Sequence, residues 1–585
     1  MIPFKAAVET IAIVEQTYDV STVRYGNLKL WPIIRSLWCQ QFSHPDKNFS
    51  NKAPDINYIT NFQPSEQQLN SMKTVGNIDL LFYSGINTEY LERVEGSYFS
   101  PFIDSTTDLI ENRYRCLKIE LNSPKSQETL PRSKKTLFLE VTAFKQNNDF
   151  SKTLDNFSDL QKTLYEITKI KVNEKLVLDQ AIHIIIWKNY FKRILSILSP
   201  KASFVVCYYT LHNMAFIWAC KELDIPVTDI QHGAVGDYHG HYTGWTNIPE
   251  DGYELIPDFY WCWGKATYKN LLKWNHPDSR HHKPIVGGNP RLSRWIHKGD
   301  LIINDDMRQF YHQLEKCEKV ILVCIGHLDI PDPPLPDPIL QAMKNSPSNW
   351  IWLVRLHPYF KSDIHKKQIN KIIKGYGITN YEIEHATEYP LFALLKRANY
   401  NVTCWPSTYY EALVFDVPTT VVNPNTLDVY KEDYQKGSLT YANSGNMLLK
   451  MVNEPPPIDI CDVSEKMDTS LRSLENIMTT IINFDKTIKM SSNLDYDLEQ
   501  YIDAMNDLGE LFFEKGYLPA ACKVFYDIIK IAPKNSVAYN NLGVLFWHKA
   551  ENKNAINCLK QALKIDPTYS RAKLNYEKIL NVSPP

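Results

Sequence analysis

The 585-residue sequence has no long apolar run and almost no net charge. No stretch approaches the roughly 18 apolar residues of a membrane span, and acidic residues interrupt the first apolar segment, unlike a signal peptide. Lys and Arg number 64 against 66 Asp and Glu, a formal charge of −2. This balance gives no reason to expect nucleic acid or an anionic membrane as a partner. The sequence therefore predicts a soluble protein with no transmembrane segment.

Paired cysteines are also missing. The 11 cysteines occur singly, with no CxxC pair and no Cys/His cluster at zinc spacing. Several, such as Cys207, Cys220 and Cys324, stand within apolar runs, where a thiol behaves as a small core side chain. This usage indicates a reducing cytoplasmic compartment. With 44% hydrophobic residues, the chain is long enough for two to four domains.

A repeat closes the chain. Small or helix-ending residues recur at a spacing of 34 in three pairs: Gly509 and Gly543, Ala521 and Ala555, Pro533 and Pro567. The small residues let two helices pack closely and the proline ends the second helix, as in tetratricopeptide repeats. We expect residues 491–585 to form tetratricopeptide-repeat helices that offer a surface to a protein partner. Two repeats are too few to stand alone, so the tail should lean on the domain before it.

Short apolar runs alternate with helical stretches in the rest of the chain. VILVCIG, WIWLVRLHP, NYNVTCWP and PTTVVNP, between about 320 and 424, are too continuously apolar to face water on one side. IDLLFYSG, TLFLEVTAF, ASFVVCYYT and IPVTDIQHG repeat this rhythm earlier. The alternation predicts an α/β fold with two doubly wound, Rossmann-like lobes, residues 1–300 and 301–490.

The strand IPVTDIQHG ends in polar residues, at the position where open α/β sheets bind ligands. Asp229 interrupts this apolar strand, and a buried carboxylate costs several kcal/mol unless it is paired or hydrogen-bonded, which often marks a site. A structural Asp bonded to loop amides is the alternative. His232, His239 and His241 follow, but no carboxylate or Cys completes a metal-ligand set, so we expect no metal. The nearby glycines would let the backbone approach a substrate.

Two strand ends in the second lobe carry possible phosphate ligands. Gly326 ends VILVCIG, and Arg355, His357 and Pro358 follow WIWLV. An imidazole can donate to a phosphate, and proline frees the turn from needing an amide partner. A bare His-Pro dipeptide also occurs at ordinary strand exits.

Ser407 and Thr408 precede a helix in CWPSTYYEALVFDVP. Hydroxyls and unpaired amides there would form an anion site. Glu411 could reach sugar hydroxyls, although a plain N-cap at Ser407 with Glu411 as its capping-box partner explains the same residues. Together with the His-Pro strand end, this segment predicts a site that binds a phosphate group and a ribose.

The ordered motifs LWPIIRSLW, IPVTDIQHG, IPDFYWCWG, VGGNPR, RLHPYF and PSTYYEALVFDVP resemble the bacterial surface-polysaccharide glycosyltransferases of GT-B fold, over roughly residues 25–450. The chain is most similar to the retaining β-Kdo transferases of O-antigen and capsule assembly, and more distantly to bacterial sialyltransferases. The sialyltransferases carry an acidic-acidic-Gly motif where this chain has Gln231-His232-Gly233. Their inverting mechanism is therefore not implied.

The resemblance implies a CMP-sugar-dependent transferase that moves Kdo or a related ulosonic acid onto lipopolysaccharide O-antigen or capsule. It implies that His357, Pro358, Ser407 and Thr408 contact the CMP phosphate and Glu411 its ribose. The enzyme would work in the cytoplasm, at the inner face of the inner membrane, on a glycan or lipid-linked acceptor.

If configuration is retained, a carboxylate must attack the anomeric carbon, and Asp229 is the candidate nucleophile. His232 would orient it or bind the sugar, and Glu140 could act as an acceptor-side acid or base, or form a buried structural pair. Three alternatives stay open: a GT-B transferase with a CDP-glycerol or UDP-sugar donor, a GT-B epimerase, and a non-catalytic scaffold whose tail binds assembly enzymes.

Overall fold

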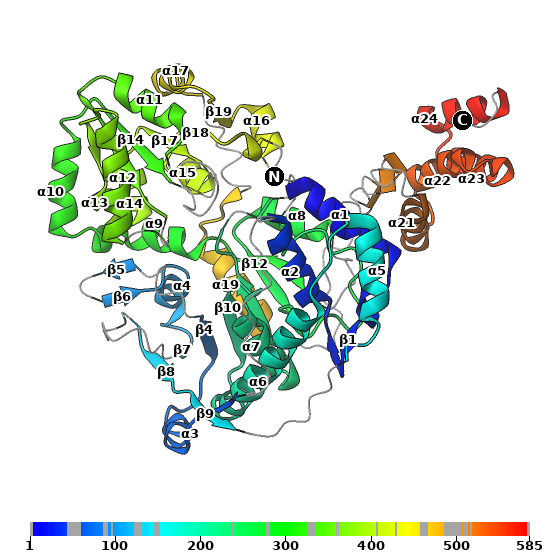
Figure 1. Ribbon diagram of the computed structural model, residues 1–585, viewed down its shortest axis with the longest axis horizontal. Helices are drawn as coiled ribbons and strands as arrows, with labels where there is room; N and C mark the ends of the chain where they lie inside the picture. The colour runs from blue at the N-terminus through cyan, green and yellow to red at the C-terminus, as the bar shows by residue number, and fades with distance from the viewer. Residues whose placement is uncertain are drawn as a thin grey trace.

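The computed structural model shows two α/β lobes and a helical tail (Figure 1). It describes residues 4–581 except for these segments: 44–59, 86–91, 95–96, 122–131, 133, 146–152, 234, 237–238, 275–280, 326–334, 358–359, 361, 405–407, 428–429, 457–465, 485–501, 503–504, 507–508, 511–512 and 515–517. Gly326, Pro358 and Ser407, three of the residues predicted to bind the donor, lie outside the described residues.

The first lobe is built on a seven-stranded parallel sheet in the order β13-β12-β11-β10-β4-β7-β8. In chain order its strands are β4 (Leu80–Ser84), β7 (Cys116–Leu121), β8 (Thr136–Leu139), β10 (Ala202–Val206), β11 (Val227–Ile230), β12 (Phe259–Cys262) and β13 (Lys283–Val286). Most strand residues are buried because helices cover both faces, which explains their continuously apolar sequences.

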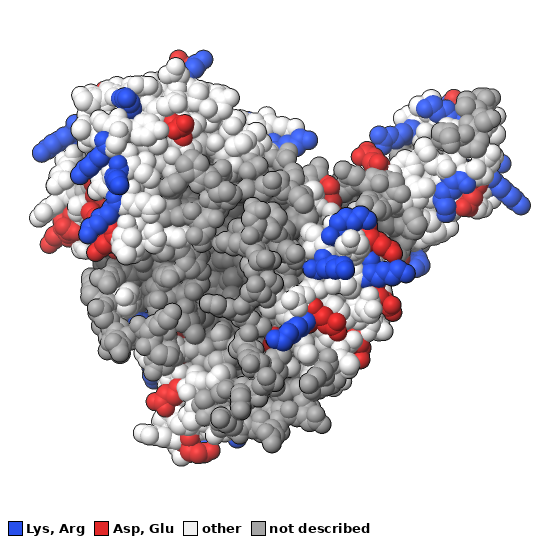
Figure 2. Space-filling model, in the orientation of Figure 1, with Lys and Arg blue, Asp and Glu red and all other residues white. Residues whose placement is uncertain are grey.

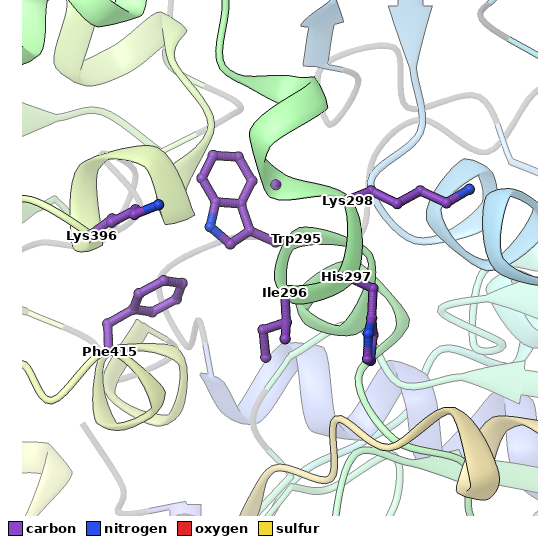
Figure 3. Close-up of a pocket in the computed structure, with 7 residues that line it drawn as sticks. Trp295, Ile296, His297, Lys298, Lys396 and Phe415 are labelled. Carbon is purple, nitrogen blue, oxygen red and sulfur yellow. The ribbon is translucent and has the colours of Figure 1, made fainter.

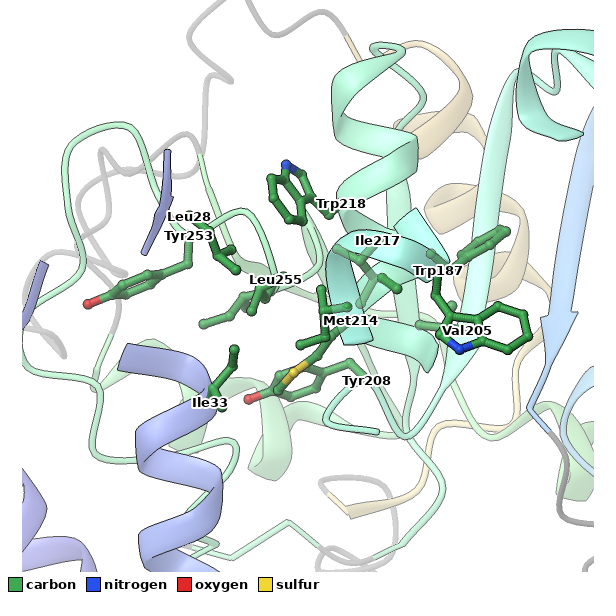
Figure 4. Packing of buried hydrophobic residues seen from close by; sticks show 14 of the residues in the cluster. Leu28, Ile33, Trp187, Val205, Tyr208, Met214, Ile217, Trp218, Tyr253 and Leu255 are labelled. Atoms are coloured by element: carbon green, nitrogen blue, oxygen red, sulfur yellow. The ribbon is translucent and has the colours of Figure 1, made fainter. Parts of the chain in front are cut away.

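One face of this sheet packs against α6 (Glu174–Leu198) and α7 (Leu211–Glu222). Tyr208, Met214 and Ile217 belong to the cluster on this side, together with Ile33 of α2 (Trp31–Ser43) (Figure 4). The opposite face packs against α4 (Ile103–Ile110) and α19 (Leu471–Ile482). Neighbouring residues of β4 point to opposite clusters, as the two-residue period of a strand requires.

The second lobe has a six-stranded parallel sheet in the order β16-β15-β14-β17-β18-β19. Its strands are β14 (Lys319–Cys324), β15 (Trp350–Arg355), β16 (Tyr381–Glu382), β17 (Tyr400–Thr403), β18 (Thr419–Val421) and β19 (Leu439–Tyr441). In each sheet the first three strands of the chain lie in sequence order, and the fourth then pairs with the free edge of the first strand. The strand order reverses between β4 and β10 and between β14 and β17, which are the usual ligand-binding points of doubly wound sheets. The predicted GT-B-like class is confirmed.

The chain crosses between the lobes twice. It leaves the first lobe through α9 (Pro290–Ile302) and returns along residues 466–470, where the Asn289 amide donates to the Asp468 carbonyl at 2.8 Å. Helix α19 then buries Leu474, Ile477 and Met478 against the first sheet. The sequence places residues 301–490 in one lobe, but α19 lies on the other, because its apolar face matches the uncovered side of the first sheet.

The tail contains α21 (Leu518–Ile531), α22 (Ser536–His548), α23 (Asn552–Ile565) and α24 (Ser570–Asn581). A Cβ atom on Gly543 would lie 2.7 Å from Leu559 Cγ, so the predicted close helix packing at this glycine is confirmed. The tail leans on α1 (Phe4–Thr17), whose Ala12 and Ile13 join its core. Its support is therefore the first lobe, not the second lobe that precedes it in the chain.

Among the described helices, none is both long enough and apolar enough to cross a membrane. Figure 2 shows Lys and Arg side chains interspersed with Asp and Glu over the described part of one face, in keeping with the formal charge of −2.

Candidate active site

Asp229, the third residue of β11, is buried with 1% of its surface exposed. Its Oδ2 accepts a hydrogen bond from the Tyr242 hydroxyl at 2.7 Å, and its Oδ1 accepts one from the Tyr208 amide at 3.2 Å. Burial raises the pKa of Asp229 to about 8, although these hydrogen bonds oppose the rise. The carboxyl group is therefore mostly protonated at neutral pH. In this state both of its oxygens are occupied, as the structural alternative predicts.

The groups packed around Asp229 do not titrate near pH 8. Burial raises the pKa of each neighbouring thiol and phenol, at Cys207, Tyr208, Tyr209, Tyr242 and Tyr260. Burial lowers the pKa of the His232 imidazole to about 4, with a smaller contribution from His239. Among these groups only Asp229 changes charge between pH 6 and 10.

His232 follows Asp229 by three residues and lies half-buried beyond the end of β11. Its Nε2 is 3.4 Å from the Tyr209 hydroxyl and its Nδ1 is 3.5 Å from the Tyr242 hydroxyl. Both contacts are long for hydrogen bonds, so the imidazole can exchange either one for a substrate hydroxyl. A Cβ atom on Gly233 would meet nothing within 4 Å, so the backbone directly after His232 borders open space.

The segment after His232 packs its aromatic side chains against one another and against Tyr209. The Tyr209 ring stacks on the His241 ring with centroids 3.9 Å apart and an interplanar angle of 6°. Burial lowers the pKa of His239 to about 4 and also holds that of His241 well below its usual value. Within the described residues, no three His, Cys, Asp or Glu side chains are grouped to hold a metal ion. Sequence reasoning missed Tyr209 and Tyr242, although Tyr242 stands in the segment that the histidines marked.

Glu140 lies away from this group. It is exposed at the end of β8, where its carboxylate accepts from the Ser65 hydroxyl at 3.2 Å. The sheet order places β8 four strands from β11, about 19 Å at a strand spacing of about 4.8 Å. The structure does not bring Glu140 together with Asp229, because sheet order and not sequence order decides which strand ends are neighbours. Glu140 also forms no buried pair, since its side chain is exposed.

The described residues that the sequence predicted to bind the donor lie at or beyond the ends of β15 and β17, the two strands that flank β14. Cys324 pairs with Thr403 in the sheet, so the loops after both strands start side by side. Thr408 is the N-cap residue of α15 (Tyr409–Val414), and His357 is half-buried two residues beyond β15. Arg355 has a structural contact: its Nη1 donates to the carbonyl oxygens of Ala386 at 2.8 Å and Tyr389 at 2.6 Å, at the end of α13 (Glu384–Glu388).

Glu411 connects the second lobe to α9. Its carboxylate is buried and lies 3.6 Å from the Arg291 guanidinium, which also covers the Phe392 ring at 4.7 Å. The motif VGGNPR contains Arg291, but reasoning from the sequence assigned this residue no contact. The ion pair orients Glu411 from outside its own lobe.

A cavity of about 390 Å³ opens farther along α9 (Figure 3). Its lining residues come from α9 and from the ends of α14 (Leu391–Leu395) and α15: Trp295, Ile296, His297, Lys298, Gly299, Lys396 and Phe415. Lys298 is engaged, since its ammonium donates to the Asp108 carbonyl at 2.8 Å. No predicted site residue lies in this cavity.

Residues 536–569 match the tetratricopeptide repeat family. By sequence, no curated protein matches the chain. Solved structures that resemble it include the UDP-GlcNAc 2-epimerase from Neisseria meningitidis bound to UDP-GlcNAc, with 14% identity, a TM-score of 0.42, and coverage of 70% of this chain and 100% of that chain. A UDP-glucosyltransferase from Polygonum tinctorium has 11% identity and a TM-score of 0.42, with 70% and 99% covered.

Proposed function

We propose that the chain is a GT-B-type glycosyltransferase that moves Kdo or a related ulosonic acid from its CMP donor to a bacterial surface glycan. The observation that carries the proposal is the carboxyl group of Asp229, which is buried near the end of a parallel strand, with His232 three residues beyond it. A buried ionisable side chain destabilises the fold, so it is retained where function requires it. A lobe without a function would have no need of such a group.

The donor would bind at the reversal point of the second sheet. Thr408 follows β17 and His357 follows β15, the strands on either side of β14, and Ser407 and Pro358 adjoin them in sequence. CMP leaves as a monophosphate, whose developing charge can be met by hydroxyls, amides and an imidazole without a metal ion. Glu411, which pairs with Arg291, is the residue that we propose to contact the ribose.

The proposed reaction is a double displacement with retention. The Asp229 carboxylate attacks the anomeric carbon, the bond from that carbon to the phosphate oxygen breaks, and CMP leaves with the electron pair. An acceptor hydroxyl then attacks the same carbon, the bond to Asp229 breaks, and the hydroxyl proton passes to uncharged His232. The first step requires Asp229 to be ionised and to exchange its hydrogen bond from Tyr242 for the sugar.

The decisive experiment is mass spectrometry of the intact protein and its products after incubation with CMP-Kdo and an acceptor glycan. We expect a sugar adduct on a peptide that contains Asp229 and a product with retained configuration. Asp229→Asn should form no adduct, whereas Glu140→Gln serves as a matched control that keeps full activity. An inverted product would exclude Asp229 as nucleophile, and the absence of transfer from CMP, CDP or UDP donors would refute the enzyme class.

The tail has a separate proposed role. Its repeat helices would bind a protein partner of the assembly machinery, because tetratricopeptide helices present extended surfaces and none of the proposed site residues lies in them. A truncated protein that transfers sugar in solution but no longer binds the assembly enzymes would support this division of labour.

A further inference from the structure

A buried ion pair joins the first two helices to the segment that carries the site histidines. Glu15 of α1 and Arg35 of α2 are both 0% exposed, and their side chains are in direct contact. Burying two charges costs more than their attraction returns unless hydrogen bonds satisfy the remaining donors and acceptors. The partners of this pair therefore show what it holds in place.

Arg35 directs its guanidinium at the backbone of residues 239–247, hereafter the site loop. Its Nε donates to the Gly240 carbonyl at 3.0 Å and its Nη1 to the Gly244 carbonyl at 2.9 Å, while Nη2 donates to the Thr243 carbonyl. The guanidinium also lies 4.1 Å from the centroid of the Trp245 ring. Only the planar fork of arginine can serve three carbonyls and a carboxylate at once.

Glu15 holds the other end of the site loop. Its Oε2 accepts from the Thr246 hydroxyl at 3.0 Å and from the Asn247 amide at 3.2 Å, while its Oε1 accepts from the Trp31 indole at 2.7 Å. The ion pair thus binds carbonyl groups at one end of the loop and an amide and a hydroxyl at the other.

The glycines of the site loop let it sit directly on these helices. A Cβ atom on Gly240 would lie 2.7 Å from Cys39 Sγ, and one on Gly244 would lie 2.5 Å from Val8 Cγ1. Gly244 also has a φ of +75°, which disfavours any other residue. The sequence prediction that glycines here bring the backbone to a substrate is corrected: these two bring it to α1 and α2.

We propose that Arg35 and Glu15 are positioning residues of the active site, which fix the site loop so that the Tyr242 hydroxyl meets Asp229 and the His239 and His241 rings pack against Tyr242 and Tyr209. This inference rests on the proposed function. It assigns a role to the motif LWPIIRSLW, which contains Arg35. A pair that served stability alone could be replaced by apolar side chains at no loss, so its many contacts to one loop indicate a geometric purpose.

Arg35→Lys tests the proposal because it keeps the charge opposite Glu15 and removes the fork. We expect kcat to fall about 10- to 100-fold, as for a displaced catalytic group, while the affinity for CMP, bound in the other lobe, stays unchanged. A loosened loop also admits water to Asp229. Because burial is the largest cause of the raised pKa of that carboxyl, the rising limb of the pH–rate profile should move to lower pH.

Lys118→Arg is the matched control, since Lys118 and Asp104 form an equally buried ion pair that joins β7 to α4. It should change neither kcat nor the pH profile. Glu15→Gln provides a second variant should Arg35→Lys fail to fold. Unchanged kcat and an unchanged pH profile in a folded variant would overturn the proposal, as would an equal loss of CMP affinity.

Hydrogen exchange of the loop amides separates this inference from the proposed function. Residues 239–247 should exchange at least tenfold faster in Arg35→Lys than in Lys118→Arg, whether or not the protein transfers sugar. Faster loop exchange in a protein without transferase activity would keep the anchoring of the loop and reject the enzyme. Equal exchange in the two variants would refute the anchoring itself.

Discussion

Asp229→Asn should stabilise the first lobe while it abolishes transfer. Asparagine has the shape of a protonated carboxyl group: its oxygen can accept from the Tyr208 amide, and its NH2 group can donate to the Tyr242 hydroxyl. The buried hydrogen bonds therefore survive. What disappears is the ionisable group, whose charge the interior disfavours.

The magnitude follows from the pKa of Asp229, which is raised from 3.8 to about 8. Each pKa unit corresponds to about 1.4 kcal/mol. The folded state keeps a proton that the unfolded chain releases, so the stability contributed by Asp229 falls as pH rises from about 4 to about 8 and then levels off. At pH 7 this loss is about 4 kcal/mol, and asparagine avoids it.

Native-state hydrogen exchange of the β11 amides measures the local free energy of opening in both proteins. The advantage of Asp229→Asn should grow by about 3 kcal/mol between pH 5.5 and pH 8.5, a difference in which the other titrating groups cancel. A constant gap would show that the carboxyl group is already ionised in the folded protein, and the reasoning from burial would fail. In parallel, a near-normal transfer rate in Asp229→Asn would remove it from the mechanism.

Four further predictions concern the donor, the nucleophile, the metal and the tail. His357→Ala should weaken CMP binding by about 1–3 kcal/mol in calorimetry, and unchanged affinity would contradict a donor site in the second lobe. The value of kcat/KM should rise about tenfold per pH unit until about pH 8, because the ionised form of Asp229 attacks; a flat profile between pH 6 and pH 9 would disagree. Chelator treatment should leave activity largely intact, whereas a loss that added metal reverses would argue for a metal-dependent enzyme. Deleting residues 500–585 should preserve CMP affinity but lower solubility, since Ala12 and Ile13 lose their cover; a folded truncation that cannot bind CMP would show that the tail shapes the cleft.

Local patterns in the sequence predicted the elements well. The strands of both sheets are continuously apolar because helices cover both faces, so their hydrophobic runs mark them without any tertiary information. The repeat in the tail was equally readable, because Gly543 and its partner residues meet within one helical hairpin. Asp229 was detectable for a similar reason: a carboxyl group inside an apolar strand is anomalous wherever the strand lies.

Contacts between segments that are far apart in the chain could not be predicted from the sequence. Glu140 and Asp229 both end strands of one sheet, and only the strand order separates them by four positions. The Arg291–Glu411 pair and the Glu15–Arg35 pair each join elements that no local periodicity relates.

The sequence by itself thus determined the two α/β lobes, the repeat tail and the carboxyl group that marks the first lobe, since these depend on side-chain patterns within one or two elements. The tertiary structure decided which strand ends are neighbours, where α19 and the tail dock, and that Arg35 reaches the site loop. The physical reason is that burial patterns encode which face of an element is apolar, whereas the partner of that face is selected by the packing of the whole chain.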